Sequence, residues 1–200
     1  AVQGRKISDR HSHETIEQVY YILKGTPTVY LDETKYTVRE GDIVYIPPMC
    51  VHHLLNDKND DWVELLIISA PVTRKESLPI VRNWRDQAPE VSHNAAVVWE
   101  LLSSVDDDEA SSDRRRLLRM NYITRQAIQQ GQASDEHSHA DQEQIYYILG
   151  GNGSVLLGEE MFRVREGHVI YTPKDVPHKL INDGTEDWIE YLIVSAKLQL

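Results

Sequence analysis

An internal repeat limits what this chain can fold into more than any other feature of the sequence. Residues 11–70 and 137–196 align without a gap at a constant offset, because 137 − 11 and 196 − 70 both equal 126, and about 30 of the 60 aligned pairs are identical. The identical pairs include Gly25 with Gly151 and Pro47 with Pro173. Glycine and proline act through the backbone torsion φ, so these matches predict matching turns. The repeat therefore predicts one fold present twice.

Each copy consists of short apolar runs that are separated by turn residues. The runs at 19–23 and 43–46 are rich in β-branched and aromatic residues, and they are bounded by glycine, proline and acidic residues. This alternation of short runs and turns is typical of an antiparallel sandwich or barrel. The sequence therefore predicts an all-β protein with little helix.

The segment between the copies differs from them in composition. It carries three prolines and many charged residues, and we interpret it as a linker with one short helix around 78–86. Strands are expected over 97–102 and 116–126, on either side of a charged run that we interpret as a solvated hairpin tip without a function. The predicted domains are an N-terminal domain at 1–70, a linker at 71–95 and a C-terminal domain at 96–200.

Composition and charge exclude several classes of function. The net charge is −11 and the pI is near 5.2, which argues against a nucleic-acid surface and against an anionic membrane as partner. Cys50 is the only cysteine, so no intramolecular disulfide can form and a cytoplasmic setting is expected. No apolar run reaches the roughly eighteen residues of a membrane span. The chain opens at Ala1 rather than Met, which allows for a removed N-terminal segment.

A histidine pattern occurs in both copies at the same offset. His11 and His13 are followed by His52, and the second copy repeats this set as His137, His139 and His178. In a strand, side chains two residues apart share a face, so a His-x-His pair can hold one ion. A third histidine from a neighbouring strand would complete a mononuclear metal site. The pattern therefore predicts one metal site in each copy.

The spacing of these residues resembles the two motifs of the cupin family. The second copy reads Gly131-x5-His137-x-His139-x4-Gln144-x6-Gly151, and then Gly167-x5-Pro173-x-Asp175-x2-His178-x3-Asn182. The first copy keeps the same spacings, with Arg5 at the leading glycine and Met49 at a turn glycine. Both halves thus resemble cupin domains, and the whole chain resembles a bicupin. This resemblance implies two tandem jelly-roll-type β-barrels.

The fourth ligand of each site has two candidates. Counting back from the glycine that ends the first motif selects Gln18 and Gln144, whereas counting from the second histidine selects Glu17 and Glu143. Strand parity lets only one of each pair face inward unless a bulge intervenes. We favour the glutamines. The predicted metal ligands are His11, His13, Gln18 and His52 in the first copy, and His137, His139, Gln144 and His178 in the second.

A set of three histidines and one glutamine is neutral, so each site would bind a divalent ion less tightly than a set with glutamate and would favour anionic ligands. Tyr20 and Tyr146 share parity with the glutamines and are predicted to point into the barrels. There a phenol could move a proton, or it could be an ordinary core tyrosine with its hydroxyl group bonded. The remaining histidines and the repeated tryptophans are expected at the surface (His53, His93, His168) and in the core (Trp62, Trp188), respectively.

The resemblance also implies a function. Cupin enzymes place substrate oxygens on a divalent metal, so we expect one ion per barrel, with Fe as first choice and Mn, Ni, Zn or Cu as alternatives. The expected activity is that of a metal-dependent enzyme acting on a small oxygen-rich organic molecule, of the dioxygenase type first and an isomerase or lyase second. The alternative is a non-catalytic bicupin that binds or senses a small molecule. The expected partner is thus a small-molecule substrate, and homodimers are allowed.

Overall fold

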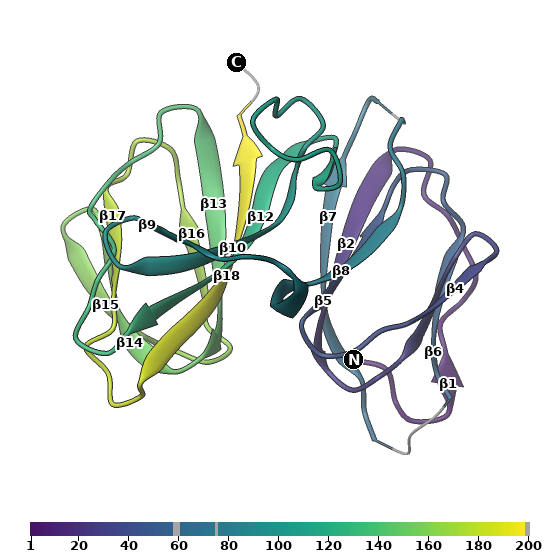
Figure 1. The fold of residues 1–200 in the computed structure, drawn as a ribbon, viewed down its shortest axis with the longest axis horizontal. Helices are drawn as coiled ribbons and strands as arrows, with labels where there is room; N and C mark the ends of the chain where they lie inside the picture. Colours follow the sequence, from purple (N-terminus) through teal and green to yellow (C-terminus); the bar gives the residue numbers. More distant parts are fainter. Residues whose placement is uncertain (58–60, 75, 199–200) are drawn as a thin grey trace. The chain divides into compact units, whose positions relative to one another are not determined.

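The computed structural model describes residues 1–57, 61–74 and 76–198 and divides the chain into two compact units. The first unit comprises Ala1–Asp86 and Ser104–Arg119, and the second comprises Gln87–Ser103 and Met120–Leu200. Both units consist of β-strands, and the one helix among the described residues is a single 3-10 turn (Figure 1). The predicted all-β fold with little helix is confirmed. None of the described segments forms a helix with the length and apolarity needed to cross a membrane.

The first unit is a sandwich of two antiparallel sheets (Figure 1). One sheet has the strand order β1-β6-β3-β4, and the other has the order β7-β2-β5-β8. The strands of these sheets are β1 (Lys6–Ile7), β2 (Ile16–Lys24), β3 (Thr28–Leu31), β4 (Thr34–Thr37), β5 (Asp42–Ile46), β6 (His52–Asn56), β7 (Glu64–Pro71) and β8 (Ile80–Asn83), and the 3-10 turn η1 (Trp84–Asp86) follows β8. The unit also contains β11 (Arg115–Leu117), which lies in neither of its two sheets.

The second unit repeats this sandwich with a different set of added strands. Its smaller sheet has the order β15-β14-β17, and in its larger sheet β10, β12, β18, β13 and β16 follow one another while β9 pairs with β10. These strands are β9 (Glu90–Ser92), β10 (Ala96–Ser104), β12 (Met120–Gln129), β13 (Gln142–Gly150), β14 (Asn152–Leu157), β15 (Glu160–Arg165), β16 (Val169–Thr172), β17 (His178–Ile181) and β18 (Trp188–Lys197).

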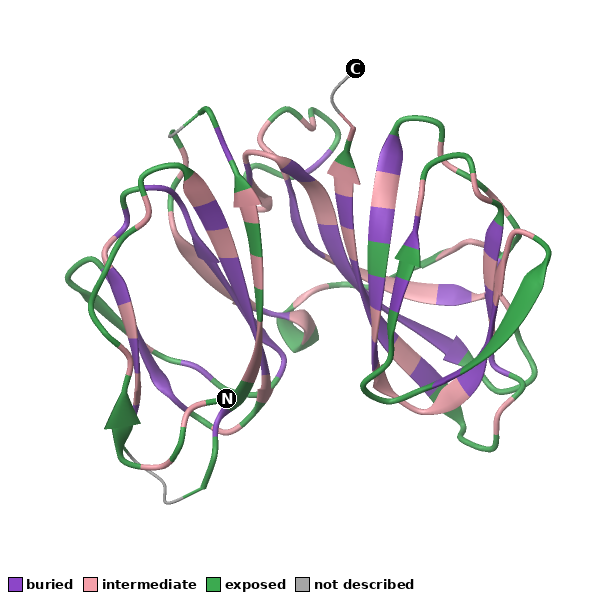
Figure 2. Ribbon diagram, turned by 180° about the vertical axis from the view of Figure 1, so that it is seen from behind, coloured by how far each residue is buried: buried purple, intermediate pink, exposed green. Residues whose placement is uncertain are grey.

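The sequence repeat is reproduced in the register of the strands. Gln18 of β2 lies opposite Ile46 of β5, and Gln144 of β13 lies opposite Thr172 of β16. β2 pairs with β7, the last strand of the first copy, and β13 pairs with β18, the last strand of the second copy. Both β2 and β13 have a β-bulge or similar irregularity near their C-terminal ends. The strand faces that point between the two sheets of each unit are buried, as Figure 2 shows. Each unit therefore has its own apolar core between its sheets.

The segment between the copies contains strands where a helix was expected. Ile80 and Val81 pair with Tyr45 and Val44 of β5, so the predicted short helix is wrong except for η1. β-branched residues pack well on a pleated sheet, and this context outweighs local helical preference. Lys75 of the predicted linker lies outside the described residues. The predicted division into 1–70, 71–95 and 96–200 stays a prediction. The two units described above are defined by how their residues pack together, which does not test these boundaries.

The charged run is largely exposed, as expected of a solvated segment, and it is also bonded to the first unit. Arg74 donates to Asp106 at 2.7 Å, and Arg82 donates to Asp113. The hydroxyl group of Ser77 donates to the carbonyl group of Arg116. These contacts explain why Ser104–Arg119 belongs to the first unit although it follows strands of the second.

Candidate metal centres

The first three predicted histidines lie together in the first unit. His11 and His13 are on the segment that leads into β2, and a β-bridge between His11 and His52 places that segment beside β6. The ring centroid of His11 lies 4.9 Å from that of His13 and 4.4 Å from that of His52. One nitrogen from each ring lies within 4.8 Å of the other two. Three histidines so close together can hold a single ion.

The second unit contains the same arrangement. His137 is bridged to His178 of β17, and its ring centroid lies 4.9 Å from that of His139 and 4.4 Å from that of His178. The remaining centroid distance, between His139 and His178, is 5.3 Å, against 5.4 Å for the matching pair in the first unit. The duplication therefore preserved the relative positions of the three rings.

The hydrogen bonds of the histidines identify the nitrogens that face the centre of each cluster. His52 Nδ1 lies 3.0 Å from the carbonyl oxygen of Cys50, and His178 Nδ1 lies 2.9 Å from that of Val176. A carbonyl oxygen can only accept, so Nδ1 carries the proton and Nε2 presents its lone pair. Among the described residues, no hydrogen bond reaches the buried Nε2 atoms of these rings or those of His13 and His139. Unpartnered lone pairs that converge in this way fit a metal ion.

Burial favours the neutral form of three imidazoles, those of His52, His139 and His178. Desolvation lowers the pKa of His52, and desolvation together with the neighbouring histidines lowers the pKa of His178 to about 4. The pKa of His139 is lowered by the same causes. A neutral imidazole is the form that binds a metal, so His52 in the first cluster and His139 and His178 in the second are in the form that binds an ion at neutral pH.

In the first unit, Glu17 and Gln18 face opposite sides of β2. The buried carboxylate of Glu17 accepts hydrogen bonds from the Tyr45 hydroxyl group and from the backbone N–H groups of Leu118 and Arg119. Gln18 shares the face of Tyr20, whose ring centroid lies 6.1 Å from that of His52. The buried Gln18 Oε1 has no hydrogen-bond partner within the described part of the chain. The geometry thus favours Gln18 over Glu17 as a fourth ligand, an assignment that stays a prediction.

In the second unit, the corresponding glutamine has partners. Gln144 Nε2 donates to the hydroxyl oxygen of Tyr122 at 2.5 Å, and Gln144 Oε1 accepts from the Tyr146 hydroxyl group at 3.1 Å. Glu143 faces the outside, where it accepts from the Tyr171 hydroxyl group. The two sites therefore have the same histidines but differ in the state of the glutamine.

The two predicted tyrosines lie beside the histidine clusters. Tyr20 and Tyr146 are both buried, and each ring centroid lies 6.1 Å from that of the third histidine of its cluster. Burial raises the pKa of Tyr20 to about 12 and raises that of Tyr146 well above its usual value. Each phenol is therefore protonated at neutral pH, so it can donate a hydrogen bond or a proton but cannot act as a base.

His93 lies beside the second cluster, and its side chain is 38% exposed, in keeping with the predicted surface position. It lies in the turn between β9 and β10 with φ of 49°, and its ring stacks on that of His137 at 4.7 Å and 17°. Its Nδ1 lies 3.2 Å from Asp135 Oδ1. His93 precedes the second copy and has no counterpart in the first, so the repeat gave no signal for it. Of the other two histidines, His168 is exposed, whereas His53 stacks on Tyr30.

The repeated tryptophans also differ from expectation. Trp62 and Trp188 are both exposed, so the prediction that they lie in the core is wrong. Each stands just before or at the start of the last strand of its copy, where the chain enters the sheet from a turn. Their identity in both copies reflects this shared position rather than burial.

The comparisons with known proteins agree with this geometry. A family model described as a cupin domain matches residues 2–69 and, separately, residues 124–195. An uncharacterized protein of Methanocaldococcus jannaschii is 38% identical to this chain over 71 residues, which are 36% of the chain and 56% of the relative. The chain thus matches about half the length of that relative, whose own function is not stated.

Two solved bicupin structures resemble the whole chain. A variant of salicylate 1,2-dioxygenase from Pseudoaminobacter salicylatoxidans, in complex with gentisate, has a TM-score of 0.72 at 12% identity and matches 98% of this chain and 66% of its own. A variant of oxalate decarboxylase from Bacillus subtilis has a TM-score of 0.73 at 14% identity and matches 98% of this chain and 69% of its own. At these identities the likeness establishes the fold alone.

Proposed function

The chain belongs to the cupin family, with one cupin domain in each half, and on this premise we propose that it is a metal-dependent enzyme acting on a small oxygen-rich organic substrate. A dioxygenase-type reaction is the first choice, and isomerase or lyase chemistry is the second. The observation that carries the proposal is the convergence of unpartnered histidine nitrogens in each unit.

The residues that would hold the metal are the three histidines of each cluster, with Gln18 as a fourth ligand in the first unit. A divalent ion bound there would supply a Lewis acid with open positions for substrate oxygens. Because all these side chains are neutral, the site would keep the full positive charge of the ion and would attract an anionic substrate.

The chain's own residues supply proton transfer and orientation. Tyr20 keeps its proton at neutral pH and stands beside His52, so it can donate a hydrogen bond to an oxygen of a bound substrate. In the second unit, the Tyr146 hydroxyl group already donates a hydrogen bond to Gln144 Oε1. We infer that the first unit is the better equipped for turnover.

The same contrast supports a second function for the second unit. With Gln144 held by two tyrosines and His93 added beside His137, that site has more fixed partners around its histidines. Such a site suits binding or sensing of a small molecule without reaction, which is the alternative for the protein as a whole.

The experiment is an oxygen-uptake assay on protein loaded with Fe(II), using gentisate, salicylate and oxalate as probes, repeated with Mn(II), Ni(II) and Zn(II) while substrate loss is followed by chromatography. The proposal expects turnover that His13→Ala abolishes and that His139→Ala reduces less. Binding of a probe without oxygen uptake or substrate loss for any metal would favour the non-catalytic alternative.

A further inference from the structure

A short turn between β9 and β10 lies beside the second histidine cluster. Ser92 pairs with Ala96, so the hairpin closes through the residues between them, 93–95. His93 and Asn94 in this turn have φ of 49° and 69°, in the left-handed region. Residues other than glycine seldom adopt this conformation, although histidine and asparagine do so more often than most. The surrounding structure must therefore hold the turn in place.

The turn is bonded to the segment that leads to His137. The carbonyl group of His93 accepts from the N–H group of Asp135 at 3.2 Å. The side-chain amide of Asn94 donates to the carbonyl group of Ala133 at 3.3 Å. These bonds hold the His93 ring against the His137 ring, with centroids 4.7 Å apart and planes inclined by 17°. The position of His93 beside the metal centre is thus built into the fold of the second unit.

Asp135 determines which nitrogen of His93 is free. Its Oδ1 lies 3.2 Å from Nδ1 of His93. A carboxylate oxygen at this distance accepts a hydrogen bond, so Nδ1 carries the proton and Nε2 of the neutral ring presents its lone pair. Within the described part of the chain, no residue donates a hydrogen bond to this Nε2 atom. His93 therefore offers an unused acceptor.

The unused nitrogen of His93 faces the same way as the metal-binding nitrogen of His137. Asp135 Oδ1 lies 3.2 Å from Nδ1 of His93 and 3.8 Å from Nδ1 of His137. Because the rings are nearly parallel, both Nδ1 atoms lie toward Asp135 and both Nε2 atoms point away from it. His137 Nδ1 also lies 3.2 Å from the carbonyl oxygen of Asp135, which leaves its Nε2 for the ion. Nε2 of His93 is thus directed toward the side of the ion.

This side of the cluster is the accessible one. His178 is only 1% exposed, whereas the side chains of His137 and His93 are 21% and 38% exposed. Desolvation and the neighbouring histidines, His93 among them, lower the pKa of His139 and of His178, so His93 is within electrostatic reach of the whole cluster. A small molecule that approaches the ion from solvent therefore meets His93 and His137 first.

We propose that His93 binds the ligand of the second metal centre by accepting a hydrogen bond at Nε2, and that this site therefore takes small hydroxy acids. The inference rests on the proposed function, in which oxygens of a small molecule bind the ion. A hydroxy acid and the corresponding keto acid can both bind a divalent ion through a carboxylate oxygen and the neighbouring oxygen. Only the hydroxyl group has a proton to donate, and contact with the ion makes it a stronger donor.

The lone pair on His93 distinguishes these two kinds of ligand. A keto oxygen beside it brings a second acceptor and leaves both without a donor, whereas a hydroxyl group satisfies it. Sites that hydrogen-bond a substrate hydroxyl group discriminate strongly against analogues that lack it. Asp135 is a positioning residue here, because it holds the proton of His93 on Nδ1 and does not itself touch the ligand.

The test compares lactate with pyruvate, which differ in this one group. The full chain carries His13→Ala, so that the ion is held by the second unit, and it is loaded with Co(II) and dialysed. Each acid is titrated while the visible absorption of Co(II) is recorded, and the ratio of the two dissociation constants is compared between variants. This comparison cancels the preference that Co(II) itself has for either acid. Lactate is expected to bind the parent chain more tightly than pyruvate.

Two variants remove the acceptor in different ways. His93→Phe keeps an aromatic ring beside His137, and His93→Asn keeps a residue that tolerates the positive φ of the turn but is too short to reach the ligand. Each is expected to lower the preference for lactate about fivefold. Asp135→Ala should lower it about twofold, because His93 remains but its proton is no longer fixed on Nδ1.

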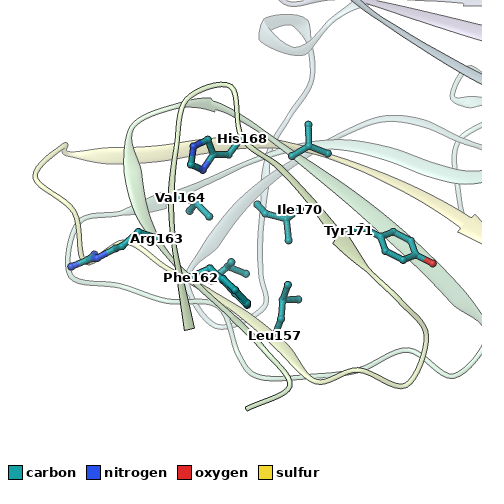
Figure 3. A pocket seen from close by; sticks show the side chains of 9 residues that line it. Leu157, Phe162, Arg163, Val164, His168, Ile170 and Tyr171 are labelled. Carbon is teal, nitrogen blue, oxygen red and sulfur yellow. The ribbon is translucent and has the colours of Figure 1, made fainter. Parts of the chain in front are cut away.

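His168→Ala is the matched control. This histidine belongs to the same unit, but it lines a groove with Phe162 and Ile170 and is not part of the histidine cluster (Figure 3). The preference for lactate should therefore stay unchanged. Melting curves recorded by circular dichroism verify that each variant folds, and one folded variant of His93 is sufficient for the test.

The outcomes separate this proposal from the proposed function. If both acids bind the ion but a folded His93 variant keeps the ratio of the parent chain, the proposal is wrong and the proposed function is unaffected. A preference for pyruvate that His93→Phe removes would also overturn the proposal, because Nε2 would then act as a donor. If neither acid changes the Co(II) spectrum of the parent chain, the proposal fails together with the premise that substrate oxygens bind this ion.

Discussion

The two histidine clusters have the same geometry in different surroundings. The matching ring distances differ by no more than 0.1 Å, yet the glutamine beside the first cluster has an unpartnered oxygen, and the glutamine beside the second is held by two tyrosines. The second cluster also has His93 stacked on one of its rings. Duplication thus preserved the three rings, and the residues around them diverged. Four predictions test whether this difference has functional consequences.

The largest effect is expected from pH on the metal-free protein. The pKa of His178 is about 4 in the folded protein and about 6.5 in an unfolded chain, so the unfolded chain binds the extra proton between these values. The free energy of unfolding should therefore be highest above pH 6.5 and fall by about 3 kcal/mol toward pH 4, at about 1.4 kcal/mol per pKa unit. Urea unfolding at pH 7.5 and 4.5 measures this difference.

The variant His178→Gln should remove most of that pH dependence. His52→Gln is the matched change in the first unit and should remove a separate part of the pH dependence, because desolvation and the neighbouring histidines, His53 included, lower the pKa of His52. Equal slopes against pH in the wild type and in His178→Gln would contradict the assignment of the effect to this histidine.

The next effect concerns the glutamates that the repeat places at matching positions. Glu17→Ala leaves the N–H groups of Leu118 and Arg119 without their acceptor, so the free energy of unfolding should fall by about 2 kcal/mol. Glu143→Ala removes an exposed contact with Tyr171 and should change it by less than about 0.5 kcal/mol. Guanidinium unfolding compares the two. Similar losses in both variants would show that Glu17 has no special structural role.

Replacing the glutamine of each site should change the metal affinity of the two sites by different amounts. Gln18→Ala is expected to weaken metal binding in the first unit about tenfold, because an available ligand oxygen is lost. Gln144→Ala should change binding in the second unit by less than about twofold, because its oxygen already accepts from Tyr146. Calorimetric titration with Zn(II), on backgrounds in which the other site carries a histidine-to-alanine change, measures each affinity. A larger loss in Gln144→Ala would reverse the comparison.

The smallest effect is expected from the added histidine. His93→Ala removes the ring that stacks on His137, and metal affinity of the second site should fall about fivefold. This is less than the roughly 10- to 100-fold loss that is usual for residues that hydrogen-bond a ligand, because a stacked ring holds His137 less firmly. The first site should not respond. His168→Ala serves as the control, since this exposed histidine of the same unit lies outside the cluster. The same calorimetric titration with Zn(II) measures this change. An unchanged Zn(II) affinity of the second site in His93→Ala would show that His93 has no role in metal binding there.

The fold and the clustering of the histidines could be predicted because both depend on local pattern. Turn glycines, period-two alternation and a constant offset of 126 are visible in the sequence, and a His-x-His pair on a strand fixes its own geometry. The register counted back from Gly25 also favoured Gln18 over Glu17 for the inner face, and the bonds of Glu17 on the other face agree with this choice.

The remaining features depend on contacts between distant segments. Nothing local in Trp84 indicates that it covers Gly41, and nothing near His93 points to His137. The charged run at 106–116 is largely exposed, as expected, but its bonds to Arg74 and Arg82 could not be predicted because these partners lie more than thirty residues away in the chain. Long-range pairing of this kind overrides local composition, so a single sequence could not reveal it.

The central claim is that each unit holds one metal ion on its three histidines. Elemental mass spectrometry on protein purified without added metal, followed by titration with Fe(II) and Zn(II), tests it directly on the wild type and on His13→Ala and His139→Ala. The account predicts two ions per wild-type chain and one in each variant, lost from the altered unit. A folded wild-type chain that binds no ion after loading, or variants that keep both ions, would contradict it.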